Sequence, residues 1–123
     1  MQKKSSNFVR IFYPKFSSEE VVRRIERITS LFKEELGLER VILFGSYARE
    51  NYTAASDIDI FIVYDGRKCD EDEVYKKLMK NLRLPRVELH ILSKRDYELT
   101  RKSKWIETIE REGKKIIDVS NDV

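Results

Sequence analysis

Two aspartates lie in a stretch that otherwise has the composition of a buried strand. Side chains alternate along a strand, so over residues 57–63 Asp57 and Asp59 share one face, while the isoleucines point to the other face and a core. A carboxylate among apolar residues is costly unless something compensates its charge. The pattern over residues 87–92 is similar and places Glu88 opposite the apolar side chains. These acids therefore indicate a site.

If the two strands are neighbours, Asp57, Asp59 and Glu88 converge. Three carboxylates repel one another unless a cation lies among them. Carboxylate oxygens suit Mg²⁺ or Mn²⁺, and two such ions can hold both the attacking and the leaving oxygen of a phosphoryl displacement. His90, the only histidine, shares the face of Glu88. We interpret it as a partly exposed strand residue rather than as a catalytic base.

A Gly45-Ser46 pair follows an apolar strand and precedes a short helix. Such a pair alone is often an ordinary turn. Beside a carboxylate site, the pair indicates a phosphate-binding turn, because N–H groups at the start of a helix attract anions and glycine lets a phosphate approach the main chain. Arg49, one helical turn further on, could reach a phosphate oxygen. These residues together predict a site for a Mg²⁺-bound nucleotide.

The elements that must position these residues follow from periodicity and capping. Apolar residues at helical spacing predict a helix over 18–36, with Ser17 and Glu20 as a capping box and Gly37 as its stop. Further along we expect strand 40–44, a short helix over 47–50, strand 57–63, a helix from Asp70 to about Leu82, strand 87–92, a helical region from Ser93 to Gly113 broken near Ser103, and an edge strand over 114–119. This order predicts an α+β domain, with a small mixed sheet flanked by helices.

Several residues have expected roles in this framework. Trp105, Ile106 and Ile109 are expected to face inward, with Trp105 as part of the core. Cys69 is expected to be an inert residue just before the helix that Asp70 caps. We divide the chain into an N-terminal arm, residues 1–16, and one domain, residues 17–120.

Composition excludes several classes of protein. No apolar run is long enough for a membrane span, and no cysteine–histidine cluster offers a zinc site. A single cysteine among 123 residues fits a reducing compartment, so we expect a cytoplasmic protein with no membrane partner. The net charge of +3 is too small to indicate direct nucleic-acid binding. Residues 41–65 differ from the rest of the chain because they are net acidic, with four acidic residues and one basic residue.

The run Leu43-Phe44-Gly45-Ser46-Tyr47-Ala48-Arg49, followed after a spacer by Ser56-Asp57-Ile58-Asp59-Ile60, resembles a known signature. It is that of the nucleotidyltransferase fold, the DNA polymerase β-like superfamily, and above all of its minimal nucleotidyltransferase branch. The resemblance covers roughly residues 20–117. It implies that Gly45 and Ser46 hold the phosphates, that Asp57 and Asp59 ligate two Mg²⁺ ions, and that Glu88 completes the metal site and helps to deprotonate an acceptor hydroxyl. The implied reaction transfers AMP from ATP and releases pyrophosphate.

Two positions depart from the family pattern. Glu50 stands where the family usually has glycine, and we expect it to alter the turn and to add a negative charge near the triphosphate. Glu88 stands where the family usually has aspartate, and its extra methylene is expected to slow the chemistry, because a metal site tolerates little misplacement.

The resemblance also implies partners. Minimal members of this family commonly act as antitoxins that bind a HEPN ribonuclease toxin and adenylylate one of its tyrosines. We therefore expect a nucleoside triphosphate as substrate, and a small helical HEPN-type partner protein or a second copy of the chain. Two alternatives stay open. The chain could be a catalytically weak or inactive binding module that sequesters its partner, or a free-standing transferase for a small hydroxyl-bearing molecule.

Overall fold

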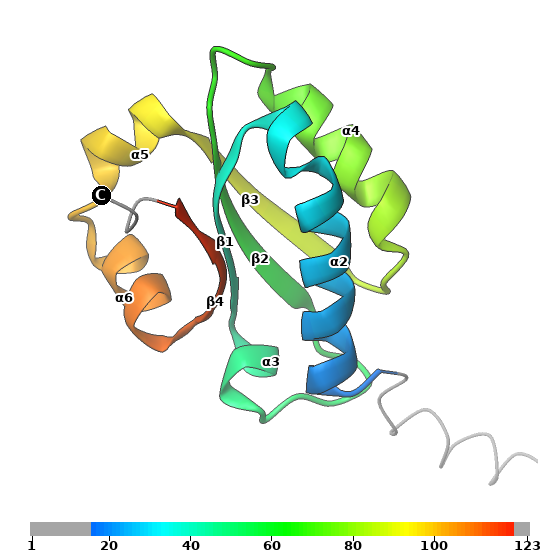
Figure 1. Ribbon diagram of the computed structural model, residues 1–123. Helices are drawn as coiled ribbons and strands as arrows, with labels where there is room; N and C mark the ends of the chain where they lie inside the picture. Colours follow the sequence, from blue (N-terminus) through cyan, green and yellow to red (C-terminus); the bar gives the residue numbers. More distant parts are fainter. Residues whose placement is uncertain (1–15, 120–123) are drawn as a thin grey trace, which may run out of the picture.

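The computed structural model describes residues 16–119, and their elements follow the predicted order (Figure 1). The predicted arm lies outside the described residues except for Phe16. The helices are α2 (Ser18–Leu36), α3 (Ser46–Arg49), α4 (Glu71–Leu82), α5 (Lys94–Thr100) and α6 (Lys104–Glu112). The strands are β1 (Leu38–Phe44), β2 (Ile58–Tyr64), β3 (Val87–Ser93) and β4 (Lys114–Asp118).

The four strands form one mixed sheet in the order β3-β2-β1-β4. Strand β1 pairs antiparallel with both β2 and β4, whereas β2 and β3 run parallel and are connected through α4. Parallel neighbours need a crossover of this kind. The predicted edge strand is thus confirmed as β4, and the two strands that carry the acids are neighbours.

Both faces of the sheet are covered by helices (Figure 1). The larger core lies against α2 and α4 and contains Ile58, Ile60 and Ile62 of β2. The smaller core lies on the other face, where Phe61 and Val63 pack with residues of α5 and α6. Apolar residues therefore fill both faces of β2 at its centre, and the polar site residue Asp59 lies near the start of the strand.

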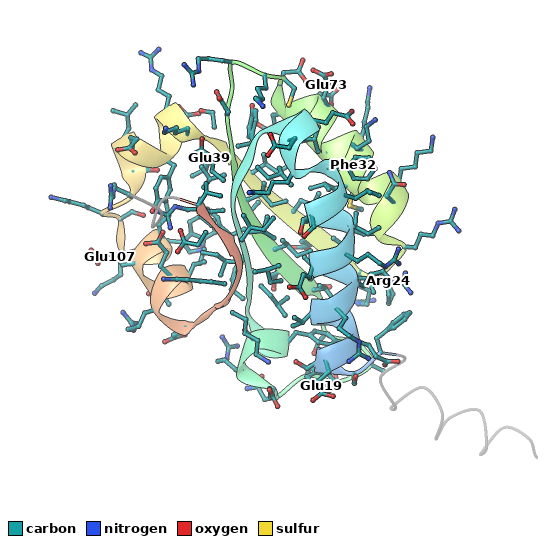
Figure 2. All side chains as sticks on the ribbon, in the orientation of Figure 1. Glu19, Arg24, Phe32, Glu39, Glu73 and Glu107 are labelled. Carbon is teal, nitrogen blue, oxygen red and sulfur yellow. The ribbon has the colours of Figure 1, made fainter. Side chains whose placement is uncertain are left out.

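The helix boundaries follow the predicted capping residues. Both capping boxes are formed, one by Ser17 with Glu20 and one by Asp70 with Glu73, and Gly37 ends α2 in the left-handed conformation. Glu73 lies in the first turn of α4, where a carboxylate also interacts favourably with the helix dipole (Figure 2). In the described part of the chain, no helix has the length and hydropathy that a membrane span needs.

The prediction that Trp105 belongs to the core is wrong. Ile106 and Ile109 are buried as expected, but Trp105 is 49% exposed. Successive helical residues are about 100° apart, so two residues spaced by three share a face and their direct neighbour lies at its edge. Trp105 instead packs edge-on against Phe44 and Phe61.

A buried charged network ties α6 to the sheet. Arg40, only 9% exposed, lies 3.4 Å from Glu110 of α6 and 3.1 Å from Asp118 of β4. Its guanidinium stacks 4.7 Å above the ring of Tyr97, and the Tyr97 hydroxyl donates a 2.5 Å hydrogen bond to Glu110. Burial and then this hydrogen bond raise the pKa of Tyr97 to about 12.

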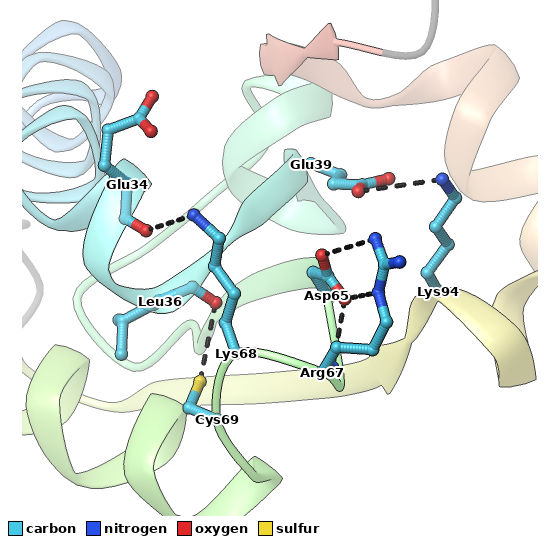
Figure 3. Close-up of polar contacts among 8 residues, drawn as sticks. All are labelled: Glu34, Leu36, Glu39, Asp65, Arg67, Lys68, Cys69 and Lys94. Carbon is cyan, nitrogen blue, oxygen red and sulfur yellow. Dashed lines mark hydrogen bonds and ion pairs between the residues drawn. The ribbon is translucent and has the colours of Figure 1, made fainter.

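The loop after β2 is joined to the end of α2 by polar contacts (Figure 3). Lys68 donates to the carbonyl of Glu34, and the Cys69 thiol donates to the carbonyl of Leu36. Both contacts satisfy carbonyls of the last helical turn, which have no partner within the helix. Burial raises the pKa of the Cys69 thiol, in agreement with the prediction that this residue is inert.

Candidate active site

Two carboxylates and an imidazole meet near the start of the two parallel strands. Asp59 of β2 stands opposite Glu88 of β3, and His90 follows on the same face of β3. Nε2 of His90 lies 3.4 Å from Oδ1 of Asp59 and 3.9 Å from Oε1 of Glu88. One possible ligand atom from each of the three lies within 4.8 Å of the others. We call these three residues the acid cluster.

Aromatic rings support the acid cluster on its inner side. The His90 ring lies 5.1 Å from that of Phe44 and 5.8 Å from that of Trp105, measured between centroids. Phe44 and Trp105 also pack edge to face, at 6.1 Å. Because these rings come from β1, β3 and α6, the orientation of His90 depends on residues distant in the sequence.

Asp57 lies outside the acid cluster. It precedes β2, and its Oδ1 lies 3.5 Å from Nε of Arg86, just before β3. Both side chains are about half exposed. An exposed ion pair contributes roughly 0–1 kcal/mol, so Asp57 can leave Arg86 at small cost. Of the three predicted carboxylates, the structure therefore brings two together and pairs the third with an arginine.

The Gly45 turn lies directly beside Asp59. Phe44 is the register partner of Asp59, so β1 ends next to the acid cluster. Gly45 has φ 80° and ψ −151°, a conformation open only to glycine. A Cβ atom at this position would lie 2.7 Å from Oδ2 of Asp59. The chain thus needs a glycine here for two independent reasons.

Helix α3 begins at Ser46, immediately after this turn. The first N–H groups of a helix have no partner within it and can face an anion. Ser46 is half-buried, and Arg49, the last residue of α3, is exposed. Tyr47 is buried beneath α3, where its ring stacks on Tyr52 at 4.2 Å, and burial raises its pKa.

Glu50 ends α3 in the left-handed conformation, with φ 62°. Glycine would adopt this conformation without strain, whereas Glu50 adopts it at a cost. Its carboxylate lies 2.9 Å from Nζ of Lys114, which also donates to Oγ of Ser18. The negative charge expected near a triphosphate is therefore partly compensated by Lys114.

The donor set fits a divalent cation. Asp59 and Glu88 offer carboxylate oxygens, which suit Mg²⁺ and Mn²⁺, and a ring nitrogen of His90 lies beside them. A second ion would need Asp57 to exchange Arg86 for the metal. Next to these acids, the Gly45 turn leads directly into the start of α3.

Comparison with known proteins agrees with this geometry. Residues 26–122 match the family described as Polymerase beta, Nucleotidyltransferase. The chain belongs to this family. It is therefore a nucleotidyltransferase, and its mixed sheet with flanking helices is the nucleotidyltransferase fold, as predicted.

Relatives of this nucleotidyltransferase carry more specific names. MJ0141 of Methanocaldococcus jannaschii, provisionally named a protein adenylyltransferase, is 31% identical over 96 residues, which are 76% of this chain and 93% of that one. MJ1379 of the same organism has the same provisional name and is 33% identical over 63 residues, 51% of this chain and 60% of the relative.

Two solved structures are also similar. One is a provisionally named nucleotidyltransferase from Sulfolobus solfataricus, with 26% identity and a TM-score of 0.46 over 67% of this chain and 75% of that chain. The other is a mutant of the toxin–antitoxin pair MntA–HpeT, with 17% identity and a TM-score of 0.49 over 78% of this chain and 74% of that chain.

Sequence reasoning gave too little weight to four residues of this nucleotidyltransferase. His90 joins the acid cluster, a position that strand alternation with Glu88 already indicated. Trp105 lies beside His90, Arg86 pairs with Asp57, and Lys114 pairs with Glu50. No local pattern marks these last three, because each contact joins separate elements.

Proposed function

We propose that this nucleotidyltransferase transfers AMP from ATP to the hydroxyl of a tyrosine on a small helical HEPN-type partner protein, and thereby acts as an antitoxin. The observation that best supports the transfer reaction is the close approach of the Gly45 turn to Asp59. The proposed phosphate-binding turn therefore lies next to the proposed site for divalent cations.

Each predicted site residue has a role in this proposal. Gly45 and Ser46 bind the phosphates of the nucleotide through the turn and the start of α3, and Arg49 contacts a phosphate oxygen. Asp57, Asp59 and Glu88 hold two Mg²⁺ ions. When bound, the ions supply charge stabilisation for the phosphates and for the attacking and leaving oxygens.

The reaction balances as a single displacement. The acceptor oxygen forms a bond to the α-phosphorus, and the bond from that phosphorus to the oxygen bridging to the β-phosphate breaks. Pyrophosphate leaves with the bonding electron pair. Glu88, 56% exposed and at the outer side of the acid cluster, receives the proton of the acceptor hydroxyl.

Support for a protein acceptor comes from the relatives. MJ0141 is provisionally named a protein adenylyltransferase, and the match covers 93% of the length of MJ0141. The sequence resemblance to minimal nucleotidyltransferases, which commonly neutralise HEPN toxins, supports the type of partner.

The test is to purify the tagged full chain from its own host and to identify the proteins that accompany it. The complex is then incubated with ATP labelled at the α-phosphate and with Mg²⁺. We expect label on a tyrosine of the partner and a mass increase of one AMP. Asp59→Asn should lower the rate of transfer at least about a hundredfold, because it removes a carboxylate that would hold the ions that stabilise the charge of the reacting phosphate.

Asp72→Asn is the matched control, since Asp72 is an exposed aspartate on α4 that pairs with Lys76. It should transfer AMP as the unmodified chain does. Tight partner binding without label transfer would contradict the enzymatic proposal and favour the sequestering module. Label on a small molecule in place of a protein would favour the free-standing transferase.

A further inference from the structure

The exposure of Trp105 has no explanation in the fold itself. Its neighbours on α6 that pack inward, Ile106 and Ile109, are buried, yet 49% of Trp105 is exposed. Its ring packs against those of Phe44, Phe61 and His90, at 6.1, 6.0 and 5.8 Å between centroids. An exposed aromatic side chain that packs beside a polar site is typical of a surface that binds a ligand.

The geometry of phosphoryl transfer indicates which reactant would bind beside Trp105. The attacking and leaving oxygens stand roughly in line through the phosphorus. The leaving pyrophosphate belongs at the Gly45 turn, at the end of β1. In the sheet, β2 lies between β1 and β3, so the acceptor oxygen must approach from the β3 side. That side carries Glu88 and His90, and Trp105 lies against His90.

We propose that Trp105 and His90 form the acceptor side of the active site and bind an aromatic ring that carries the accepting hydroxyl. This inference rests on the proposed transfer reaction. The ring of the acceptor packs on the exposed indole, and its hydroxyl points to the acid cluster. Trp105 and His90 thus determine specificity, whereas the transfer itself takes place at the α-phosphate.

The chemistry of these groups favours a phenol over an aliphatic alcohol. An indole and a second aromatic ring attract each other by about 0.5–1.5 kcal/mol beyond simple burial. A phenolic hydroxyl on such a ring can donate a hydrogen bond to Asp59 or Glu88. Serine and threonine have the hydroxyl without the ring and would leave the indole uncovered.

Trp105 is the only tryptophan of the chain, so its fluorescence reports this surface directly. The full chain is titrated with N-acetyl-tyrosinamide, with N-acetyl-leucinamide and with ATP and Mg²⁺, and only tryptophan is excited. We expect a saturable change with the tyrosine compound and none with the leucine compound. The titration with the tyrosine compound is repeated with ATP and Mg²⁺ bound, and its midpoint should not rise.

Variants test the same surface by ligand-observed NMR. Trp105→Ala should weaken binding of N-acetyl-tyrosinamide by about tenfold, which corresponds to the loss of one aromatic pair with its buried area. Trp105→Phe should keep part of the affinity. Tyr75→Ala is the matched control, because Tyr75 is an equally exposed aromatic residue, 46% exposed, on α4 on the other side of the sheet.

Three outcomes would overturn the inference. The first is no fluorescence response to the tyrosine compound. The second is its displacement by ATP, which would assign the indole to the nucleobase. The third is equal binding by Trp105→Ala with its circular dichroism unchanged. None of these readouts needs AMP transfer, so a failure of the proposed function is seen separately, in the labelling assay.

Discussion

Gly45 is the residue on which the geometry of the site most depends. It combines a backbone conformation open only to glycine with a distance of 2.7 Å between a hypothetical Cβ and the Asp59 carboxylate. A side chain here must therefore strain the turn and displace an acid at the same time. The requirement for glycine is set by the neighbouring strand as well as by the turn itself.

Gly45→Ala should lower the free energy of unfolding by about 1–3 kcal/mol, the cost of a residue in such a conformation. AMP transfer should fall by at least about a hundredfold, because Asp59 moves. Denaturant unfolding and the labelling assay measure the two effects. Gly66→Ala is the control, since its Cβ would meet only Ser93, at an ordinary 3.5 Å. Equal behaviour of the two variants would contradict this account.

Glu50 is a second residue in the left-handed backbone conformation. Its ion pair with Lys114 partly offsets the energetic cost of that conformation. A non-glycine residue in the left-handed region costs roughly 1–2 kcal/mol, and an exposed ion pair returns about 0–1 kcal/mol. Glu50→Gly should therefore raise the free energy of unfolding by up to about 2 kcal/mol. Glu50→Ala keeps the strain without the pair and should lower stability. Thermal unfolding should show a higher melting temperature for Glu50→Gly and a lower one for Glu50→Ala than for the unmodified chain.

At the scale of elements, the network around Arg40 fixes α6, the helix that carries Trp105. Arg40 pairs with Glu110 and Asp118, and the Tyr97 hydroxyl donates to Glu110. These contacts join β1, β4, α5 and α6, so the position of Trp105 relative to the acid cluster depends on a charged network in the smaller core.

This network predicts a loss of stability in alkali. Burial and the hydrogen bond to Glu110 raise the pKa of Tyr97 to about 12, from 10.0. Between these values the unfolded chain releases the tyrosine proton and the folded chain keeps it, so the stabilisation is complete below pH 10 and is lost as pH rises toward 12. The loss from this group is on the order of 2 kcal/mol.

Tyr97→Phe removes the titrating group and should flatten this part of the stability curve. Urea unfolding on both sides of the window measures the slope. Tyr75→Phe, at an exposed tyrosine on α4, should keep the slope of the unmodified chain. An unchanged slope in Tyr97→Phe would show that other groups cause the alkaline loss.

At the scale of the whole molecule, divalent cations should link the site to the stability of the fold. Asp59 and Glu88 come together only in the folded chain, so an ion that bridges them stabilises the folded state. Mg²⁺ or Mn²⁺ at a hundred times its dissociation constant should add about 2.7 kcal/mol to the free energy of unfolding. Added chelator should reverse the rise in melting temperature.

Asp59→Asn should abolish this response, because it removes one of the two carboxylates. Without metal the variant should be as stable as the unmodified chain or more so, since the repulsion with Glu88 is relieved. The control Asp72→Asn should respond to the cation normally. A marked loss of stability in metal-free Asp59→Asn would mean that Asp59 has a structural role.

Local sequence patterns were sufficient to predict the elements, their caps and those site residues that depend on short-range spacing. The capping boxes at Ser17 and Asp70 join residues three positions apart, and strand alternation has a period of two residues. Both patterns can therefore be recognised in the sequence without the tertiary structure. For the same reason Asp59, Glu88 and the Gly45 turn could be predicted, although their roles in binding and transfer stay proposals.

Which of these residues contact one another could be seen only in the folded chain. Asp57 pairs with Arg86, His90 joins the acid cluster, and Trp105 lies exposed beside it. Each of these contacts joins segments that are distant along the chain, and their geometry follows from strand order and helix placement. A side chain's type and spacing limit what chemistry it can perform, but its neighbours across the sheet decide what it does.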